Sequence, residues 1–214
     1  MRRIVHGAVL AAGVVLAAAG CGKGEAPDEA AFPPGPAAAV LTPKDVPAGY
    51  LPAQVQPAFR GVAPHDPHCR RLLELADGKG LHDVPMRGTA FYRISPGATL
   101  TQHVFAAGAV RADKTLTAAR RAAARCAALR ARVGGAELNL PRTSLSVPDL
   151  PEKDTLAVRF AERSGTGHEL SYELVMYRSG GTFLVVAQPG VVAEGEPSAA
   201  VAAAKLAAAR LLGA

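Results

Sequence analysis

Alternating apolar and polar positions recur in several segments between residues 87 and 190 and predict β-strands. The dipeptide Pro96-Gly97 separates two such segments and predicts a hairpin. Later segments joined by short turns predict an antiparallel meander, because strands joined by tight turns run antiparallel. Pro141 lacks an N–H group and therefore predicts that its segment is a weak or edge strand. The predicted strands span residues 87–95, 98–107, 137–147, 154–163, 168–178 and 182–190.

Apolar positions three to four residues apart predict helices elsewhere. Asp66 is a good N-cap, Pro67 suits the first helical position, and Gly78 is a stop signal. In the longest predicted helix, Cys126 lies in the middle of the apolar stripe, and Gly134-Gly135 ends the helix. The predicted helices are a turn that begins at Thr42, a helix over 66–78, a helix from about Asp113 to Val133, and an alanine-rich helix that begins at Pro197.

The order of these elements predicts an α+β fold. The hairpin-joined strands form a twisted antiparallel sheet, and amphipathic helices cover a face of it because each buries its apolar side there. A chain of 214 residues suits one such domain preceded by a tail. We expect this single domain over residues 41–214.

The N-terminus has the pattern of a secretory signal peptide. Arg2 and Arg3 precede an apolar run that ends in small residues, so residues 1–20 are predicted to be cleaved off. The small residues directly before Cys21 resemble a bacterial lipobox. The resemblance implies that the Cys21 thiol receives a diacylglyceryl group, whose acyl chains (palmitate, for example) anchor the protein at the extracytoplasmic face of the cell membrane. The alternatives are an ordinary secreted protein and an uncleaved anchor.

A flexible tether is expected over residues 21–40, because residues 22–40 are small, polar and proline-rich. The formal net charge of +6 falls to about +4 when the signal peptide is removed. A mildly basic exported protein favours an anionic membrane surface or wall polymer as its partner. Nucleic acid is not expected as a partner, because the basic residues are scattered and the chain is predicted to be exported.

Two cysteines, Cys69 and Cys126, remain once Cys21 is assigned to lipid. In an oxidising compartment they most simply form one disulfide, which here joins two predicted helices. A metal-binding or redox pair is the alternative. Both cysteines fall on the apolar faces of their helices, which favours a buried disulfide over a reactive site.

Metal ligation is suggested most strongly by His65 and His68, which lie close to Cys69. Asp66 and Pro67 are also what a helix start requires, and Cys69 has a predicted disulfide partner. We therefore predict no metal site and no cofactor. The sequence contains no phosphate-binding loop, nucleophile elbow or HExxH motif, so we predict no catalytic residues and no enzymatic activity.

Arginines lie off the apolar stripe of the longest predicted helix; they are Arg120, Arg121, Arg125 and Arg132. Arginines placed in this way usually form a solvated face. The alternative is contact with an anionic lipid or an anionic wall polymer.

Three features of the chain are similar to a family of actinobacterial lipoproteins that resemble the extracellular sensor domain of PknH-type serine/threonine kinases. They are "VLTPKDVPAGY" at residues 40–50, Cys69 and Cys126 on two helices, and "SYELVMYRSGGTFLVVA" at residues 171–187. The resemblance implies a twisted antiparallel sheet packed with helices and a cleft that binds an unknown ligand. Kinase sensors of that type carry a second cysteine pair, which this chain lacks.

The main functional hypothesis is a lipid-anchored extracytoplasmic protein whose sensor-like domain binds a small ligand or an envelope partner without catalysis. One alternative is metal handling through His65, His68 and His82. The other alternative is a structural role in which the arginine-rich helix contacts a wall polymer.

Overall fold

The computed structural model describes residues 32–213 except 144, 164 and 166. The predicted signal peptide, Cys21 and the first part of the expected tether lie outside these residues. Within the described part, no helix has the length and apolar character needed to cross a membrane.

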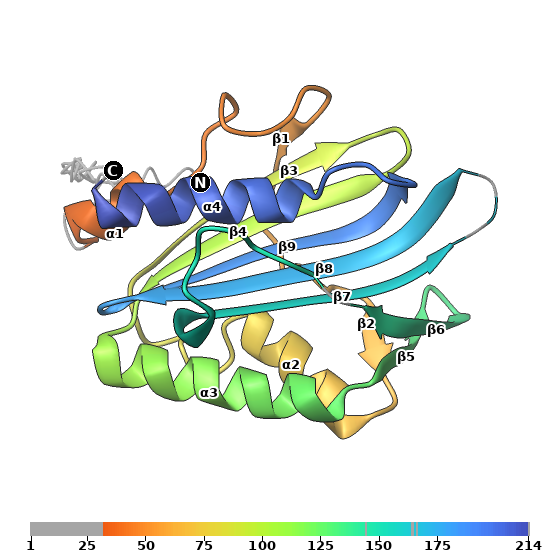
Figure 1. Cartoon of the computed structure of the whole chain (residues 1–214), viewed down its shortest axis with the longest axis horizontal. Helices are drawn as coiled ribbons and strands as arrows, with labels where there is room; N and C mark the ends of the chain where they lie inside the picture. The colour runs from red at the N-terminus through yellow and green to blue at the C-terminus, as the bar shows by residue number, and fades with distance from the viewer. Residues whose placement is uncertain (1–31, 144, 164, 166, 214) are drawn as a thin grey trace, which may run out of the picture.

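An antiparallel sheet of nine strands forms the centre of the described domain (Figure 1). The strand order is β1-β3-β4-β9-β8-β7-β6-β5-β2, so β1 and β2 are the two edges. The strands are β1 (Leu51–Ala53), β2 (Val62–Pro64), β3 (Met86–Arg93), β4 (Ala98–Ala106), β5 (Ala128–Val133), β6 (Ala136–Thr143), β7 (Thr155–Arg163), β8 (His168–Ser179) and β9 (Thr182–Ala193). The predicted hairpin is β3–β4, and the predicted meander is β7–β8–β9.

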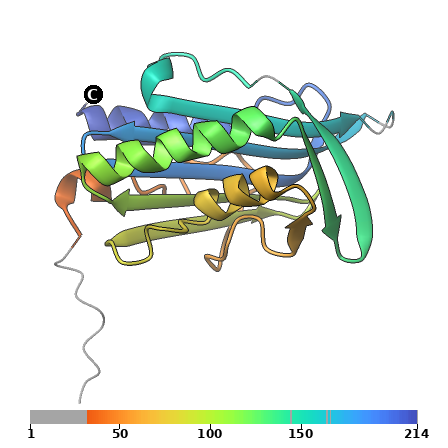
Figure 2. The same ribbon diagram turned by 90° about the horizontal axis from the view of Figure 1, so that it is seen from below.

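Helices cover both faces of this sheet, which confirms the predicted α+β class. Helices α2 (Pro67–Ala76) and α3 (Ala109–Arg125) lie on one face, as Figure 2 shows from below. Helices α1 (Pro34–Ala38) and α4 (Ala199–Leu212) lie on the other face. Residues 34–38 belong to the segment expected as a tether, and here they pack beside α4.

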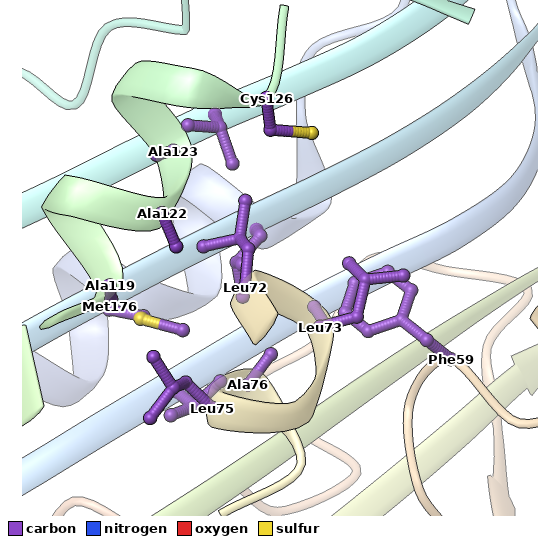
Figure 3. Packing of buried hydrophobic residues seen from close by; sticks show 14 of the residues in the cluster. Phe59, Leu72, Leu73, Leu75, Ala76, Ala119, Ala122, Ala123, Cys126 and Met176 are labelled. Atoms are coloured by element: carbon purple, nitrogen blue, oxygen red, sulfur yellow. The ribbon is translucent and has the colours of Figure 1, made fainter. Parts of the chain in front are cut away.

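Strand alternation divides the buried side chains between two cores. On β8, Leu174 and Met176 point to the face covered by α2 and α3, where Leu72 and Ala119 also pack (Figure 3). Val175 points to the opposite face and packs under α4. The face of α4 that contacts the sheet consists of alanines, which let the helix approach the sheet closely.

Helix α2 begins as its sequence predicts. The Asp66 carboxylate accepts hydrogen bonds from the backbone N–H groups of His68 and Cys69, at 2.7 and 3.0 Å. These bonds satisfy two of the donors that a helix start leaves free. After α2, Gly78 has a φ of +81°, a left-handed conformation that glycine adopts without strain.

The prediction that the longest helix runs to Val133 is wrong. Helix α3 ends at Arg125, and residues 128–133 form strand β5. Strand β5 pairs with β6 around a turn at Gly134 and Gly135, and Leu129 and Ala131 alternate with exposed arginines. The segment is short and rich in alanine and arginine, so its pattern of apolar and polar residues fits the end of a helix as well as a strand. Pairing with β6 makes it a strand.

Two smaller predictions hold only in part. Strand β6 was predicted to be a weak or edge strand; it is not at an edge, because it lies between β5 and β7, but it pairs with β7 at only two positions. The pairing of β6 with β7 begins only at Arg142, directly after Pro141, so the sheet tolerates the missing N–H group. A helical turn was predicted to begin at Thr42; residues 42–45 form one hydrogen-bonded turn that does not continue as a helix, and Thr42 donates hydrogen bonds to the Asp45 carboxylate through its backbone N–H and its hydroxyl group.

Candidate functional site

The connection between β1 and β2 joins the two opposite edges of the sheet. It consists of residues 54–61, which span at most about 28 Å when fully extended. Because the linker is so short, the sheet must curve until its edges come near each other. Figure 1 shows β5, β6 and β2 bent toward the side of α2.

A groove of about 670 Å³ lies beneath this linker. We call it the edge groove. Its floor comes from β3, β4, β8 and β9, its roof from the linker, and one wall from Val133 of β5. The lining residues are Ala53, Gln54, Gln56, Pro57, Ala58, Arg60, Gly61, Val62, Ala90, Tyr92, Gly97, Thr99, Thr101, Val133, Tyr172, Pro189 and Gly190.

Strand alternation places the polar side chains of the floor. On β4, Thr99 and Thr101 face the edge groove, whereas Leu100 packs in the core under α4. Tyr92 of β3 pairs directly with Thr99 and is 44% exposed. None of Gln54, Tyr92 or Thr99 forms a side-chain hydrogen bond with the other described residues. Their polar groups therefore remain available to a ligand.

The linker is fastened at its middle. The Ala58 N–H donates to the Asp77 carboxylate at 2.7 Å, and burial raises the pKa of Asp77. The neighbouring Phe59 ring is buried and stacks on Tyr172, with ring centroids 6.2 Å apart. The roof of the edge groove is thus held in place by a polar and an aromatic contact.

A glycine allows the close packing at one end of the floor. Gly190 has a φ of +143°, and a Cβ atom there would lie 2.5 Å from the carbonyl oxygen of Gly97. The Val191 N–H donates to the same carbonyl at 2.9 Å. Only glycine fits this contact between β9 and the β3–β4 hairpin.

The lining of the edge groove carries a single positive charge. Arg60 is its one charged lining residue, and it donates to the Gln56 amide oxygen at 2.6 Å. The lining includes no Asp, Glu, Lys, His or Cys. A lining of hydroxyl, amide and aromatic groups suits a hydroxyl-bearing ligand that is neutral or anionic. The lining provides no general base beside Thr99 or Thr101 for proton transfer.

The predicted site residues lie elsewhere. Cys69 and Cys126 form the predicted disulfide, with a Cα–Cα distance of 4.9 Å, and Figure 3 shows Cys126 at the end of α3. His65 forms a hydrogen bond with the Glu137 carboxylate at 2.7 Å, and His68 lies in a hollow between α2 and α3. In the described part of the chain, no three His, Cys, Asp or Glu side chains gather as a metal site.

A second polar region is buried under the start of α4. Glu173 is 4% exposed, accepts a hydrogen bond from the Ser198 hydroxyl, and lies 3.5 Å from the Arg159 guanidinium. Arg159 also forms an ion pair with Glu169. Burial raises the pKa of Glu173, opposed by the bond from Ser198. This region fastens α4 to the sheet, since Ser198 is also the N-cap of α4.

The family resemblance implied a cleft, but no sequence pattern located the edge groove. Its residues come from five distant segments, and β1 and β2 are each three residues long. One weak signal existed. Thr99 and Thr101 alternate on the same face of β4, where an ordinary buried strand has apolar residues.

Comparisons with known proteins indicate the fold. No protein-family model and no curated protein matches the sequence. Among solved structures, the extracellular domain of PknH from Mycobacterium tuberculosis is similar, with a TM-score of 0.59 and 15% sequence identity. The likeness covers 83% of this chain and 93% of that chain. The chain therefore has the fold of that domain, as the sequence resemblance implied.

Proposed function

We propose that this protein is a lipid-anchored, extracytoplasmic, non-catalytic binding domain, and that the edge groove holds its ligand. The proposal rests on the edge groove. It lies under a linker that joins both sheet edges, and the polar groups of Gln54, Tyr92 and Thr99 form no side-chain hydrogen bond with the other described residues. These groups favour a hydroxyl-bearing, neutral or anionic ligand, such as a saccharide.

The extracytoplasmic location is supported by three independent features. The signal peptide pattern and the small residues before Cys21 favour export and lipidation. The buried disulfide between Cys69 and Cys126 is typical of an oxidising compartment. The structural neighbour is named as an extracellular domain. A tether from Cys21 to residue 31 would keep the domain within about 35 Å of the membrane.

Ligand binding is tested by blocking the edge groove. Thr99→Trp places a large ring on its floor, and Thr99→Ser is the matched control because it keeps the hydroxyl group. Each protein is purified from its native host and measured by native mass spectrometry. We expect a bound small molecule on the wild type and on Thr99→Ser, and its loss from Thr99→Trp. An equal amount of ligand on Thr99→Trp, with unchanged thermal melting, would place the ligand outside the groove.

The anchor is tested separately by the mass of the N-terminal peptide. In protein from the native host, we expect Cys21 to be the first residue and to carry a diacylglyceryl group. Cys21→Ser should lose this mass and leave the membrane fraction or stay uncleaved. An unmodified Cys21 in the wild type would contradict the anchor and leave the groove test unaffected.

A further inference from the structure

A basic hollow of about 530 Å³ lies between α2 and α3, on the outer surface of the domain. Four cationic or titratable side chains surround it: His68 and Arg71 from α2, and Arg121 and Arg125 from α3. Alanines of α3 form the rest of its lining and leave room between the arginines. We call it the helix hollow.

The positive charge of the helix hollow is poorly compensated. Neither Arg121 nor Arg125 forms an ion pair or hydrogen bond with the described residues. Arg71 lies 3.8 Å from Glu74, but Glu74 has a closer partner in Lys79 at 2.7 Å. The Asp66 carboxylate beside His68 is occupied as the helix N-cap. The helix hollow therefore attracts anions.

The other flank of α3 is basic as well. Arg120 donates to the carbonyl oxygen of Thr155 at 3.0 Å, and Arg142 donates to that of Ala123. Bonds to carbonyl groups do not neutralise a guanidinium. Arg120 also donates to the carbonyl oxygen of Glu152 in the short 3-10 turn η2 (Glu152–Asp154), in which the Asp154 carboxylate is paired with Arg178 at 2.8 Å. Positive charge thus extends across α3 beyond the helix hollow.

The disulfide fixes the two halves of the helix hollow relative to each other. Cys69 directly follows His68, and Cys126 directly follows Arg125. Because the two cysteine Cα atoms are 4.9 Å apart, the basic residues of α2 and α3 cannot separate when the charges repel. The backbones of α2 and α3 then need no rearrangement on binding, which favours affinity. Arginine also suits phosphate groups, since its planar guanidinium can donate two parallel hydrogen bonds.

We propose that the helix hollow is a docking site for an anionic polymer that carries phosphate groups. The choice of a polymer over the membrane surface rests on the proposed anchor and on where the described chain begins. Phe32 is partly buried and packs against the core that lies under α4, on the face of the sheet opposite α2 and α3. An anchor at Cys21 is therefore joined to the domain on the α1 and α4 face, whereas the helix hollow lies on the opposite face.

Binding to linear polyphosphate tests the proposal. The full-length protein is held by its anchor in nanodiscs of neutral phosphatidylcholine, and affinity is measured at several salt concentrations. We expect Arg121→Gln/Arg125→Gln to weaken binding at least tenfold and to reduce the slope of log affinity against log salt by about two. Arg130→Gln/Arg132→Gln removes the same charge from exposed positions on β5 and should change affinity less than twofold.

Three results would overturn the proposal. The first is the same loss of affinity in both double variants, which would mean that net charge alone matters. The second is no binding of polyphosphate by the wild type in about 50 mM salt. The third is competition by phosphatidylglycerol vesicles that equals polyphosphate at the same phosphate concentration, since the membrane surface would then be the partner. Thr99→Trp should bind polyphosphate normally, so failure of the edge groove proposal can be recognised separately.

Discussion

Removal of the Cys69–Cys126 disulfide should lower the free energy of unfolding by about 4 kcal/mol. The two cysteines are 57 residues apart in sequence, and the chain-entropy relation assigns about this value to a closed loop of that length. Both cysteines are only 1% exposed, so the bond lies inside the core formed with α2 and α3. The stabilisation acts mainly by restricting the unfolded chain.

The assay is urea unfolding followed by circular dichroism. Cys69→Ala/Cys126→Ala is compared with the wild type, with and without a reducing agent. We expect the reducing agent to destabilise the wild type by nearly the same amount and to leave the double variant unchanged. This second comparison separates the lost cross-link from the small cavity that alanine leaves.

The reasoning would be refuted if both measurements gave a loss below about 1 kcal/mol, since the loop relation predicts several times more. It would also be refuted if the double variant lost much stability and the reduced wild type lost none. The missing sulfur atoms, rather than the cross-link, would then account for the effect.

Three further perturbations test other parts of the structure. A hydrogen bond from Arg210 lowers the pKa of Asp45 from 3.8 to about 2, so its stabilisation is present above pH 4 and is lost as the pH falls toward 2. Asp45→Asn should therefore cost about 1 kcal/mol at pH 7 by urea unfolding and much less near pH 2, and an equal cost at both would contradict the ion pair. Burial raises the pKa of Glu173, so the folded state holds this proton more tightly than the unfolded state and stability falls as the pH rises above 4.5. Glu173→Gln should flatten that fall in thermal melting between pH 4 and 7, whereas an unchanged slope would assign it to another group. Ala204 is fully buried against the sheet, and Ala204→Leu should cost about 1–3 kcal/mol in urea unfolding, while a neutral result would show that α4 has room to move.

Local patterns were sufficient to predict most of the sheet. The Pro96-Gly97 turn and the alternation of β7, β8 and β9 predicted antiparallel neighbours, because tight turns leave no other arrangement. Asp66 and Pro67 predicted the start of α2 for the same kind of reason, since capping is a local interaction.

Patterns failed at short segments and where distant pairing decided the structure. In β5, the sequence "ALRARV" is too short to distinguish a strand from the end of an arginine-rich helix, and the hairpin that it forms with β6 across Gly134 and Gly135 makes it a strand. Strands β1 and β2 have three residues each, and their place at opposite edges depends on all the strands between them. No local pattern could therefore predict the edge groove, which requires both edges to be positioned.

The polar side chains of the sheet differ in whether they are hydrogen-bonded within the protein, and this separates residues with a structural role from residues that can bind a ligand. On the face under α4, Gln102 bonds to the backbone of Leu41 and Ala39, and Gln188 bonds to the N–H group of Ala200. These amides hold the covering segments in place, because a buried polar group must be bonded within the protein. On the opposite face, Thr99 points into the edge groove and has no such partner among the described residues. The same strand alternation thus places bonded amides under α4 and unbonded hydroxyl groups in the part of the opposite face that α2 and α3 leave uncovered, where a ligand can supply the missing bonds.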